Sequence, residues 1–356
     1  MILPALLLAA GTTLTPQAPA ADALQRAVDS VRTDLDVRGV AVALVLPDGT
    51  TWQGVSGEAY AGVPVTPETA FEIASITKTF TGGLAVLLAR DGVLALDATI
   101  EPWLPNLPNA AHITIRQLLT HTSGLDDVFT QAGFIPRIIG NPARVWSAPE
   151  VLALVGDADF PPGEGWGYSS SGFVAAGVIM EAVGGAPLAE LYRRHLFGPL
   201  EMTRTFYGGI ETVTEPAAHA FYDFNNDGVA DDLSLVMPAT ALHTAAGPAG
   251  ALISTAADLA RGIRALATPD FLGAPGLAAF TTFVDRPDGH RYGLGLLRIE
   301  LDGTILVGHR GNSAGFSAEA WHAPERGVTI TVLTNRHGIA VTPFVSALLE
   351  VLARAG

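Results

Sequence analysis

Ser75 and Lys78 place a hydroxyl and an amine three residues apart. The segment from Ser75 to Arg90 is rich in apolar residues and predicts a buried helix that starts at Ser75. Residues three apart share a helix face, with about 5 to 6 Å between their Cβ atoms, so the two side chains can share a proton. A serine becomes a strong nucleophile when a neighbouring base removes its proton. An amine serves as that base when burial and nearby positive charge favour its neutral form. The pair therefore predicts acyl transfer, with a developing oxyanion stabilised at the helix start.

The same spacing also occurs at ordinary solvated helix ends, so the surrounding sequence decides between the two interpretations. Residues 71–80 read FEIASITKTF. Further blocks follow in order: 113–125 ITIRQLLTHTSGL, 162–169 PGEGWGYS, 197–202 FGPLEM, 250–255 GALIST and 292–295 YGLG. Together they resemble the superfamily of serine β-lactamases, D-Ala-D-Ala carboxypeptidases and class C-like esterases, the penicillin-recognising serine hydrolases. The resemblance extends over nearly the whole chain.

This resemblance implies roles for residues distant from Ser75 in the chain. Tyr168 falls where the family has a tyrosine whose phenol transfers a proton between nucleophile and leaving group; the alternative is a packed surface tyrosine. The family pattern is usually Tyr-x-Asn, whereas this chain has Ser170 in the third position. A short hydroxyl there replaces an amide that would bind an acylamino side chain. We therefore expect poor turnover of penicillins.

A third family element corresponds to His309-Arg310-Gly311, where β-lactamases commonly carry Lys-Thr-Gly. By this resemblance His309 donates to a substrate carboxylate or to the Tyr168 oxygen, and Gly311 lets the substrate approach the strand closely. The family position also implies an oxyanion hole made of the backbone N–H groups of Ser75 and Asn312. The alternative is that His309 is a structural histidine at a strand end.

Several substrates remain open at the level of sequence. The first expectation is a peptide ending in D-alanine or a small ester. The alternatives are an amidase or D-aminopeptidase acting on linear amides, a β-lactamase, or a non-catalytic binding module of the same fold. Tyr-x-Ser combined with His309 is also similar to the nylon-oligomer amidase branch.

Three other patterns are weaker. Residues 311–315 match Gly-x-Ser-x-Gly, but the segment after Ser313 predicts a strand where a nucleophile elbow needs a helix. Residues 223–231 resemble half of a calcium loop, yet Ser234 stands where a bidentate Glu belongs, which favours a solvated acidic turn. His121 lies outside any His-Glu-x-x-His pattern, which favours a role in stabilising a loop. We expect no metal and no cofactor.

The elements that must position these residues lie at both ends of the chain. A helix is predicted over 21–36, strands over 40–46 and 51–55, then strands over 293–299, 304–308, 316–321 and 328–333 and a helix over 341–354. The simplest arrangement is an α/β (α+β) fold of the β-lactamase/transpeptidase type. One antiparallel sheet from 21–70 and 285–356 would be flanked by helices, and 71–284 would form an inserted, mostly helical lobe.

Composition restricts the partners and the compartment. The formal net charge of −15 argues against nucleic acid. Residues 1–20 combine an apolar run with Ala18-Pro19-Ala20 and predict an export signal, hence a periplasmic or secreted protein. No other stretch approaches the length of a membrane span, and the sequence leaves the oligomeric state undetermined.

Overall fold

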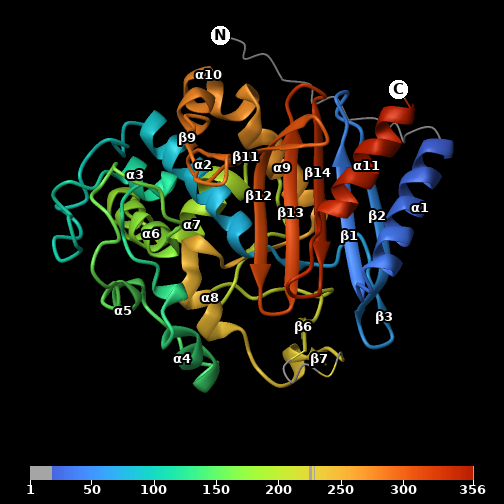
Figure 1. The fold of residues 1–356 in the computed structure, drawn as a ribbon, viewed down its shortest axis with the longest axis horizontal. Coiled ribbons are helices and arrows are strands. Elements are labelled where there is room, and N and C mark those ends of the chain that lie inside the picture. The colour runs from blue at the N-terminus through green and yellow to red at the C-terminus, as the bar shows by residue number, and fades with distance from the viewer. Residues whose placement is uncertain (1–17, 224–226, 228, 356) are drawn as a thin grey trace, which may run out of the picture.

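The computed structural model describes residues 18–223, 227 and 229–355. Its centre is a nine-stranded antiparallel sheet with the strand order β3-β2-β1-β14-β13-β12-β11-β10-β9 (Figure 1). The strands are β1 (Gly39–Val45), β2 (Thr51–Tyr60), β3 (Val63–Pro64), β9 (Val284–Asp285), β10 (Arg291–Tyr292), β11 (Leu297–Leu301), β12 (Thr304–Ser313), β13 (Phe316–Ala323) and β14 (Val328–Thr334). β1 pairs with β14, Val42 opposite Val332, so the two ends of the chain meet in one sheet. The predicted fold class is confirmed.

The sheet is covered on both faces, which is why every residue of β1, β13 and β14 is buried. Successive side chains of a strand point to opposite faces. Val40, Val42 and Leu44 accordingly enter the core beneath α1 (Ala18–Asp34) and α11 (Thr342–Ala355). Ala41 and Ala43 enter the main core on the other face. Figure 1 shows α1 and α11 side by side on their face.

Helices form most of the remaining chain: α2 (Thr77–Arg90), α3 (Ile115–Thr120), α4 (Phe134–Gly140), α5 (Ala148–Leu152), α6 (Ser170–Gly184), α7 (Leu188–Tyr192), α8 (Thr240–Ala246), α9 (Ala256–Ala267) and α10 (Pro269–Phe280). Helix α9 lies within the range that the sequence assigned to the helical lobe, yet it packs on the sheet against β1 and β14. The lobes of this fold are therefore joined through a shared core.

Short strands occur in the part of the chain where the sequence predicted few. β4 (Phe71–Glu72), β5 (Phe206–Tyr207) and β8 (Leu252–Ser254) form a small sheet, and β6 (Phe221–Tyr222) pairs with β7 (Asp231–Asp232). Strands of two or three residues are too short to show an alternating pattern. Their pairing is decided by the tertiary contacts around them.

The strand predicted over 293–299 is interrupted in the structure. β10 ends at Tyr292, β11 begins at Leu297, and Gly295 between them has a φ of 73°. A Cβ at Gly295 would lie 2.1 Å from the carbonyl oxygen of Lys78, so this turn packs directly against the start of α2.

The predicted export segment 1–20 lies outside the described residues up to residue 17, and α1 begins at Ala18. Within the described part of the chain, no single helix is long and apolar enough to cross a membrane. α6 together with Leu188–Phe197 passes that test by length and composition, but this pair is bent by 76°.

Candidate active site

Ser75 lies in a short 3₁₀ helix, η1 (Ala74–Ile76), between β4 and α2. The α-helix itself begins at Thr77, so the predicted start of the helix at Ser75 is corrected by two residues. Ala74 has a φ of 45° and is buried, which fixes the turn that presents Ser75. The nucleophile candidate therefore projects from a tight turn whose backbone is constrained on both sides.

Lys78 is enclosed at the bottom of this turn. Its side chain is only 1% exposed. Its Nζ donates to Ser75 Oγ at 3.2 Å and to the carbonyl oxygen of Ala249 at 2.8 Å. The carbonyl acceptor orients the amine, and the hydroxyl lies within proton-transfer distance of it. The structure thus brings Ser75 and Lys78 together as the spacing predicts.

The position of α2 depends on close backbone packing. A Cβ at Gly82 would lie 1.8 Å from the carbonyl oxygen of Leu294, and Thr79 Oγ1 donates to the carbonyl oxygen of Gly295 at 2.7 Å. Both contacts join α2 to the turn between β10 and β11. Lys78 is consequently held in register with the sheet.

Tyr168 lies beside this pair, on the loop before α6. Lys78 Nζ is 4.8 Å from the centroid of the Tyr168 ring, and the phenol is 36% exposed. Among the described residues, the Tyr168 hydroxyl forms no hydrogen bond with Ser75 or Lys78. Catalytic hydrogen bonds are often loose before substrate binds. The three side chains therefore line one cavity.

The ring of His121 packs against the ring of Tyr168. Its ring centroid lies 4.3 Å from that of Tyr168, and its Nδ1 accepts from the Ser169 backbone N–H at 3.0 Å. Burial, followed by the positive charge of Lys78, lowers the pKa of His121 well below its usual value, so the ring is neutral. This geometry fits the interpretation that His121 stabilises a loop.

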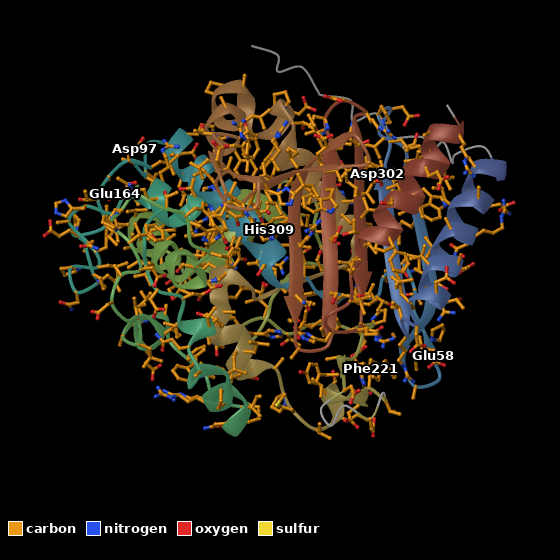
Figure 2. All side chains as sticks on the ribbon, in the orientation of Figure 1. Glu58, Asp97, Glu164, Phe221, Asp302 and His309 are labelled. Atoms are coloured by element: carbon orange, nitrogen blue, oxygen red, sulfur yellow. The ribbon has the colours of Figure 1, made fainter. Side chains whose placement is uncertain are left out.

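His309 lies on β12 near the centre of the molecule (Figure 2). Its Nδ1 is 2.6 Å from the carbonyl oxygen of Arg310, and its Nε2 is 2.8 Å from Tyr292 Oη. Burial, and then the charge of Lys78, lowers the pKa of His309 to about 3. The neutral ring therefore donates through Nδ1 and accepts through Nε2. Neither nitrogen is available to a substrate carboxylate in this arrangement, in contrast to the predicted role.

Gly311 also has a different use from the one expected. A Cβ there would lie 2.1 Å from the carbonyl oxygen of Ile73. The absent side chain thus makes room for the backbone just before η1, whereas the sequence predicted room for a substrate. β12 and the nucleophile turn are thereby brought into direct contact.

Asn312 and Ser170 both line the same cavity as Ser75. Asn312 Oδ1 accepts from Ser317 Oγ and from the Gly338 backbone N–H, both at 3.3 Å. Ser170 is the first residue of α6 and is largely buried. An oxyanion hole built from the N–H groups of Ser75 and Asn312 remains a prediction that this placement allows.

The cavity has a volume of about 750 Å³ and contains Ser75, Lys78 and Tyr168 in its lining. One side is apolar and is formed by Phe129, Ile135, Ile138, Ile139, Leu233, Met237 and Leu242. Within the described residues, Lys78 is the only lysine or arginine in the lining, whereas Asp127 and Glu72 both contribute carboxylates. The cavity therefore combines apolar and acidic surface with a single enclosed cation.

Asp127 was missed by sequence reasoning. Its side chain is 6% exposed and accepts from the Phe129 backbone N–H at 3.2 Å. Burial raises the pKa of Asp127, while a backbone hydrogen bond from Ser170 opposes that shift. It follows the block 113–125 by two positions, but only the fold shows that its carboxylate reaches the cavity.

Glu72 was missed as well. Its Oε2 accepts from Ser313 Oγ at 2.8 Å, and its Oε1 lies 2.9 Å from His243 Nε2. Ser313 is thus bound to a carboxylate and sits between two antiparallel strands, β12 and β13. This arrangement supports the interpretation that Ser313 is not a nucleophile.

No group of three or more His, Cys, Asp or Glu side chains that could hold a metal ion occurs in the described part of the chain. The acidic segment 223–231 falls partly outside that part. Its described portion reaches β7 at Asp231, and the Val229 backbone N–H donates to Asp227 Oδ1 at 2.8 Å.

A Ser-x-x-Lys pair with an enclosed lysine, a neighbouring tyrosine and an antiparallel sheet flanked by helices are the features that the penicillin-recognising serine hydrolases share. The sequence model of the family described as Beta-lactamase matches residues 24–353, and the chain belongs to this family. The resemblance stated from the sequence motifs is confirmed.

Individual relatives are distant in sequence. Penicillin-binding protein 4* of Bacillus subtilis is 27% identical over 77% of this chain and 62% of its own length. Penicillin-binding protein 4 of Amycolatopsis lactamdurans is 28% identical over 92% and 88%, and a D-aminopeptidase of Cereibacter sphaeroides is 27% identical over 90% and 61%. The chain thus spans about three fifths of the length of the first and third of these relatives.

Solved structures share nearly the whole fold. The D-amino acid amidase of Ochrobactrum anthropi SV3, in complex with L-phenylalanine amide, superimposes with a TM-score of 0.84 at 27% identity. The match covers 95% of this chain and 99% of the amidase. Nearly the whole chain therefore has the same fold as this amidase.

Proposed function

We propose that this chain hydrolyses amides or esters of small amino acids or peptides that carry a free ammonium group. The observation that carries the proposal is the buried carboxylate of Asp127 in the lining of the cavity that holds Ser75. A carboxylate has about four acceptor positions, and two backbone N–H groups occupy only part of them. A substrate ammonium would fill the remainder as a charge-assisted pair.

The same cavity gives little support to substrates with a free carboxylate. Such substrates include penicillins and peptides ending in D-Ala-D-Ala. Lys78 is committed to Ser75 and Ala249, and His309 is bound to Tyr292 and Arg310. A substrate carboxylate would therefore be brought beside Asp127 and Glu72 without a free cation to pair with. The amidase and D-aminopeptidase alternatives fit this surface better than the carboxypeptidase expectation.

The reaction would proceed through an acyl-enzyme. Ser75 Oγ attacks the carbonyl carbon while its proton passes to Lys78 Nζ, a step that takes place in the unprotonated form of the amine. The N–H groups of Ser75 and Asn312 stabilise the oxyanion, and Tyr168 gives a proton to the departing amine or alcohol. Water then attacks the acyl carbon, and its proton returns through Tyr168 and Lys78. Ser75 is released together with a carboxylic acid.

The D configuration is proposed from the relatives alone. A D-aminopeptidase and a D-amino acid amidase, by their names, lie among proteins that match most of this chain. The apolar side of the cavity, with Phe129 and Ile138 among its residues, would receive an apolar side chain of either configuration. Chirality therefore has to be measured.

The test compares D- and L-phenylalanine amide, N-acetyl-D-phenylalanine amide, a D-Ala-D-Ala peptide and a chromogenic cephalosporin. We expect the D amide with a free ammonium to be hydrolysed fastest and acetylation to lower kcat/KM by about tenfold or more, because the charge-assisted pair is lost. Asp127→Asn should lower kcat/KM for the free amine and leave the acetylated substrate unchanged. A faster reaction with the cephalosporin or the D-Ala-D-Ala peptide would overturn the proposal.

Covalent labelling tests the nucleophile independently of substrate choice. The protein is incubated with a fluorophosphonate and the adduct is located by peptide mass mapping. We expect the label on Ser75 and none in Ser75→Ala, with Ser313→Ala as the matched control that keeps full labelling. Labelling of Ser313, or none in folded protein, would contradict the assignment.

A further inference from the structure

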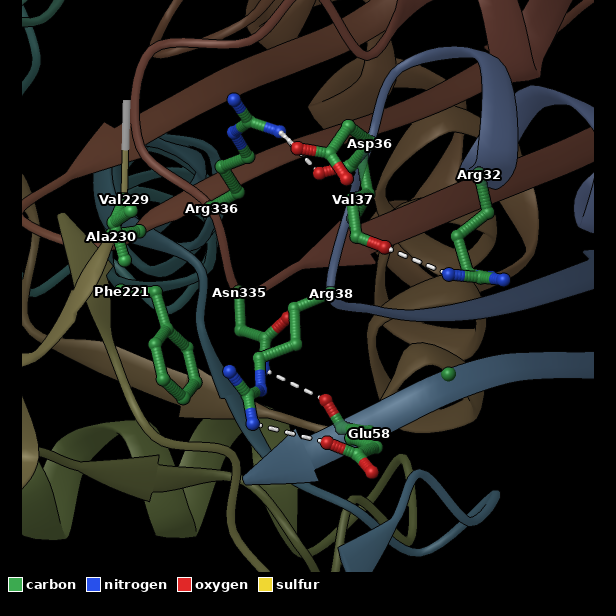
Figure 3. A pocket seen from close by; sticks show the side chains of 11 residues that line it. Arg32, Asp36, Val37, Arg38, Glu58, Phe221, Val229, Ala230, Asn335 and Arg336 are labelled. Atoms are coloured by element: carbon green, nitrogen blue, oxygen red, sulfur yellow. Dashed lines mark hydrogen bonds and ion pairs between the residues drawn. The ribbon is translucent and has the colours of Figure 1, made fainter. Parts of the chain in front are cut away.

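A second cavity, of about 600 Å³, lies where the end of α1 meets β1, β2 and β6. Its lining contains three guanidinium groups, those of Arg32, Arg38 and Arg336, against the carboxylates of Asp36 and Glu58 (Figure 3). We call it the arginine pocket. Figure 2 places its residues Glu58 and Phe221 well away from His309. In a chain with a formal net charge of −15, such a gathering of positive charge needs a physical explanation.

The positive charge in this pocket is only partly neutralised. Arg32 donates to neutral acceptors, Ser56 Oγ at 2.8 Å and the Val37 carbonyl oxygen at 3.1 Å, and forms no ion pair within the described residues. Arg38 pairs with Glu58 at 3.0 Å through one nitrogen, while its buried Nε has no hydrogen-bond partner in the described part of the chain. This Nε is enclosed, but the Arg38 side chain as a whole is 37% exposed, so the outer N–H groups of Arg32 and Arg38 are open to an external acceptor.

Arg336 is already paired with Asp36. The two groups are 2.9 Å apart, and the Asp36 side chain is 95% exposed. With Arg38 paired to Glu58, the charged groups of the lining leave the positive charge of Arg32 uncompensated. The pocket therefore attracts an anion chiefly through Arg32, with Arg38 beside it.

The shape of the pocket selects the kind of anion. Guanidinium groups match the planar geometry of a carboxylate with two parallel hydrogen bonds. The volume exceeds that of an inorganic ion, and Val229, which is 67% exposed, supplies apolar surface for an organic group. Val37 and Phe221 are buried, and the Arg38 guanidinium lies 4.5 Å from the centroid of the Phe221 ring. We propose that the arginine pocket binds a small organic acid through its carboxylate, with its apolar part against Val229.

The arginine pocket shares two segments with the active-site cavity. On β6 the side chain of Phe221 lines the arginine pocket, while its neighbours Ala220 and Tyr222 line the active-site cavity. Arg336 lines the arginine pocket and the adjacent His337 lines the active-site cavity, where its Nδ1 contacts the Ser313 carbonyl oxygen at 2.6 Å. A ligand that orders these segments would change the shape of the active site.

Hydrolysis through an acyl-enzyme releases a carboxylic acid whatever the leaving group, so the ligand belongs to the chemical class of the product. This identification of the acid rests on the proposed function. The binding itself does not. Occupancy of the arginine pocket then follows the concentration of the acid, and the active site changes with that occupancy.

The binding test uses protein whose Ser75 has first been blocked with a fluorophosphonate, titrated with phenylacetate in a calorimeter. Phenylacetamide, inorganic phosphate and Arg326→Gln, an exposed arginine in the turn between β13 and β14, serve as controls. We expect saturable binding of phenylacetate only, weakened about tenfold or more by Arg32→Gln or Arg38→Gln and unchanged by Arg326→Gln. No binding, equal binding of phosphate or phenylacetamide, or insensitivity to both pocket variants would overturn the site.

Two further measurements test the site if a variant does not fold or if the fluorophosphonate does not react with Ser75. If the label does not react, unmodified protein is titrated instead. A crystal soaked with para-iodophenylacetate locates the acid without any substitution, and iodine in the arginine pocket, beside Val229, is expected. Iodine only in the cavity of Ser75 would refute the second site.

The coupling is tested by turnover. Phenylacetate should alter kcat/KM for a nitrophenyl ester in the wild type and have no such effect in Arg32→Gln, because the active-site cavity itself offers no free cation to a carboxylate. Identical inhibition of wild type and variant would overturn the coupling. If phenylacetate binds to the arginine pocket but the protein hydrolyses none of the substrates, the proposed function fails and the proposed binding site stands.

Discussion

Lys78 is the only lysine in the sequence, and it lies buried against the candidate nucleophile. Burying an amine costs free energy of desolvation, and such groups are found mainly at functional sites. This burial favours a catalytic role for Lys78. Its two hydrogen-bond partners, Ser75 and the Ala249 carbonyl, leave it no carboxylate partner within the described residues. The amine is thereby poised to exchange a proton with Ser75.

Replacement of this amine tests its role directly. Lys78→Met preserves the length and apolar stem of the side chain while removing the base. We expect kcat/KM for the best substrate to fall by about 10² to 10⁴, the range of a positioned general base, with the folded far-UV spectrum retained. Fluorophosphonate labelling of Ser75 should slow in parallel. A folded variant with wild-type labelling would show that another group activates Ser75.

Asp127 predicts a pH dependence confined to one kind of substrate. Because burial raises the pKa of Asp127 above its ordinary value of 3.8, the carboxylate takes up a proton at a higher pH than a surface aspartate does. As the pH falls through that pKa, kcat/KM for D-phenylalanine amide should decrease more steeply than for its N-acetyl derivative. Parallel profiles for the two amides would argue against an ammonium at Asp127. The profile of Asp127→Asn should lack the extra step.

Among the elements, β12 is the one whose contact with η1 shapes the site. The strand extends to Ser313, five residues beyond the predicted end at 308, and carries His309, Gly311 and Asn312 past the nucleophile turn. The contact is made by backbone, since the carbonyl oxygen of Ile73 occupies the place of a Gly311 side chain. The distance between strand and turn is therefore set by the smallest residue.

A methyl group at this contact should separate the two elements. Gly311→Ala is expected to lower the free energy of unfolding by about 1 to 3 kcal/mol, as overpacking does, and to reduce kcat through displacement of Asn312 from Ser75. Gly140→Ala, at the end of α4 where an added Cβ meets nothing within 4 Å, is the matched control. Denaturant unfolding and steady-state kinetics of the two variants decide the outcome. Full activity in Gly311→Ala would mean that the strand can shift freely.

At the scale of the whole molecule, buried neutral histidines tie stability to pH. Burial lowers the pKa of His322 to about 4 and that of His309 to about 3, and it places that of His121 well below 6.5. In the unfolded chain these rings take up protons near pH 6.5. Below that pH the unfolded state therefore binds more protons than the folded state, and stability falls as the pH decreases toward about 4.

His322 offers a test outside the site, because its Nδ1 contacts Thr329 Oγ1 between β13 and β14. His322→Gln should reduce the slope of unfolding free energy against pH, between pH 6.5 and about 4, by about one proton. Urea unfolding at several pH values measures this slope. An unchanged slope would show that His322 titrates normally in the folded protein.

The sequence by itself determined the candidate catalytic residues and the class of fold. Ser75 and Lys78 are related by helical spacing, and β1 and β14 consist mostly of apolar and β-branched residues. Both patterns can be recognised in the sequence because they reflect local geometry and burial. The blocks around Tyr168 and His309 were identified through their resemblance to a family. The residues that contact each block in the folded protein were not identified from the sequence.

Only the tertiary structure decided what those side chains contact. Asp127 and Glu72 enter the cavity through chain segments whose neighbours in space are remote in sequence, and His309 turns toward Tyr292, 17 residues earlier. Gly311 makes room for Ile73, a contact that no spacing rule reveals. The charge and shape of a cavity are sums over distant segments, so they exist only once the segments have packed together.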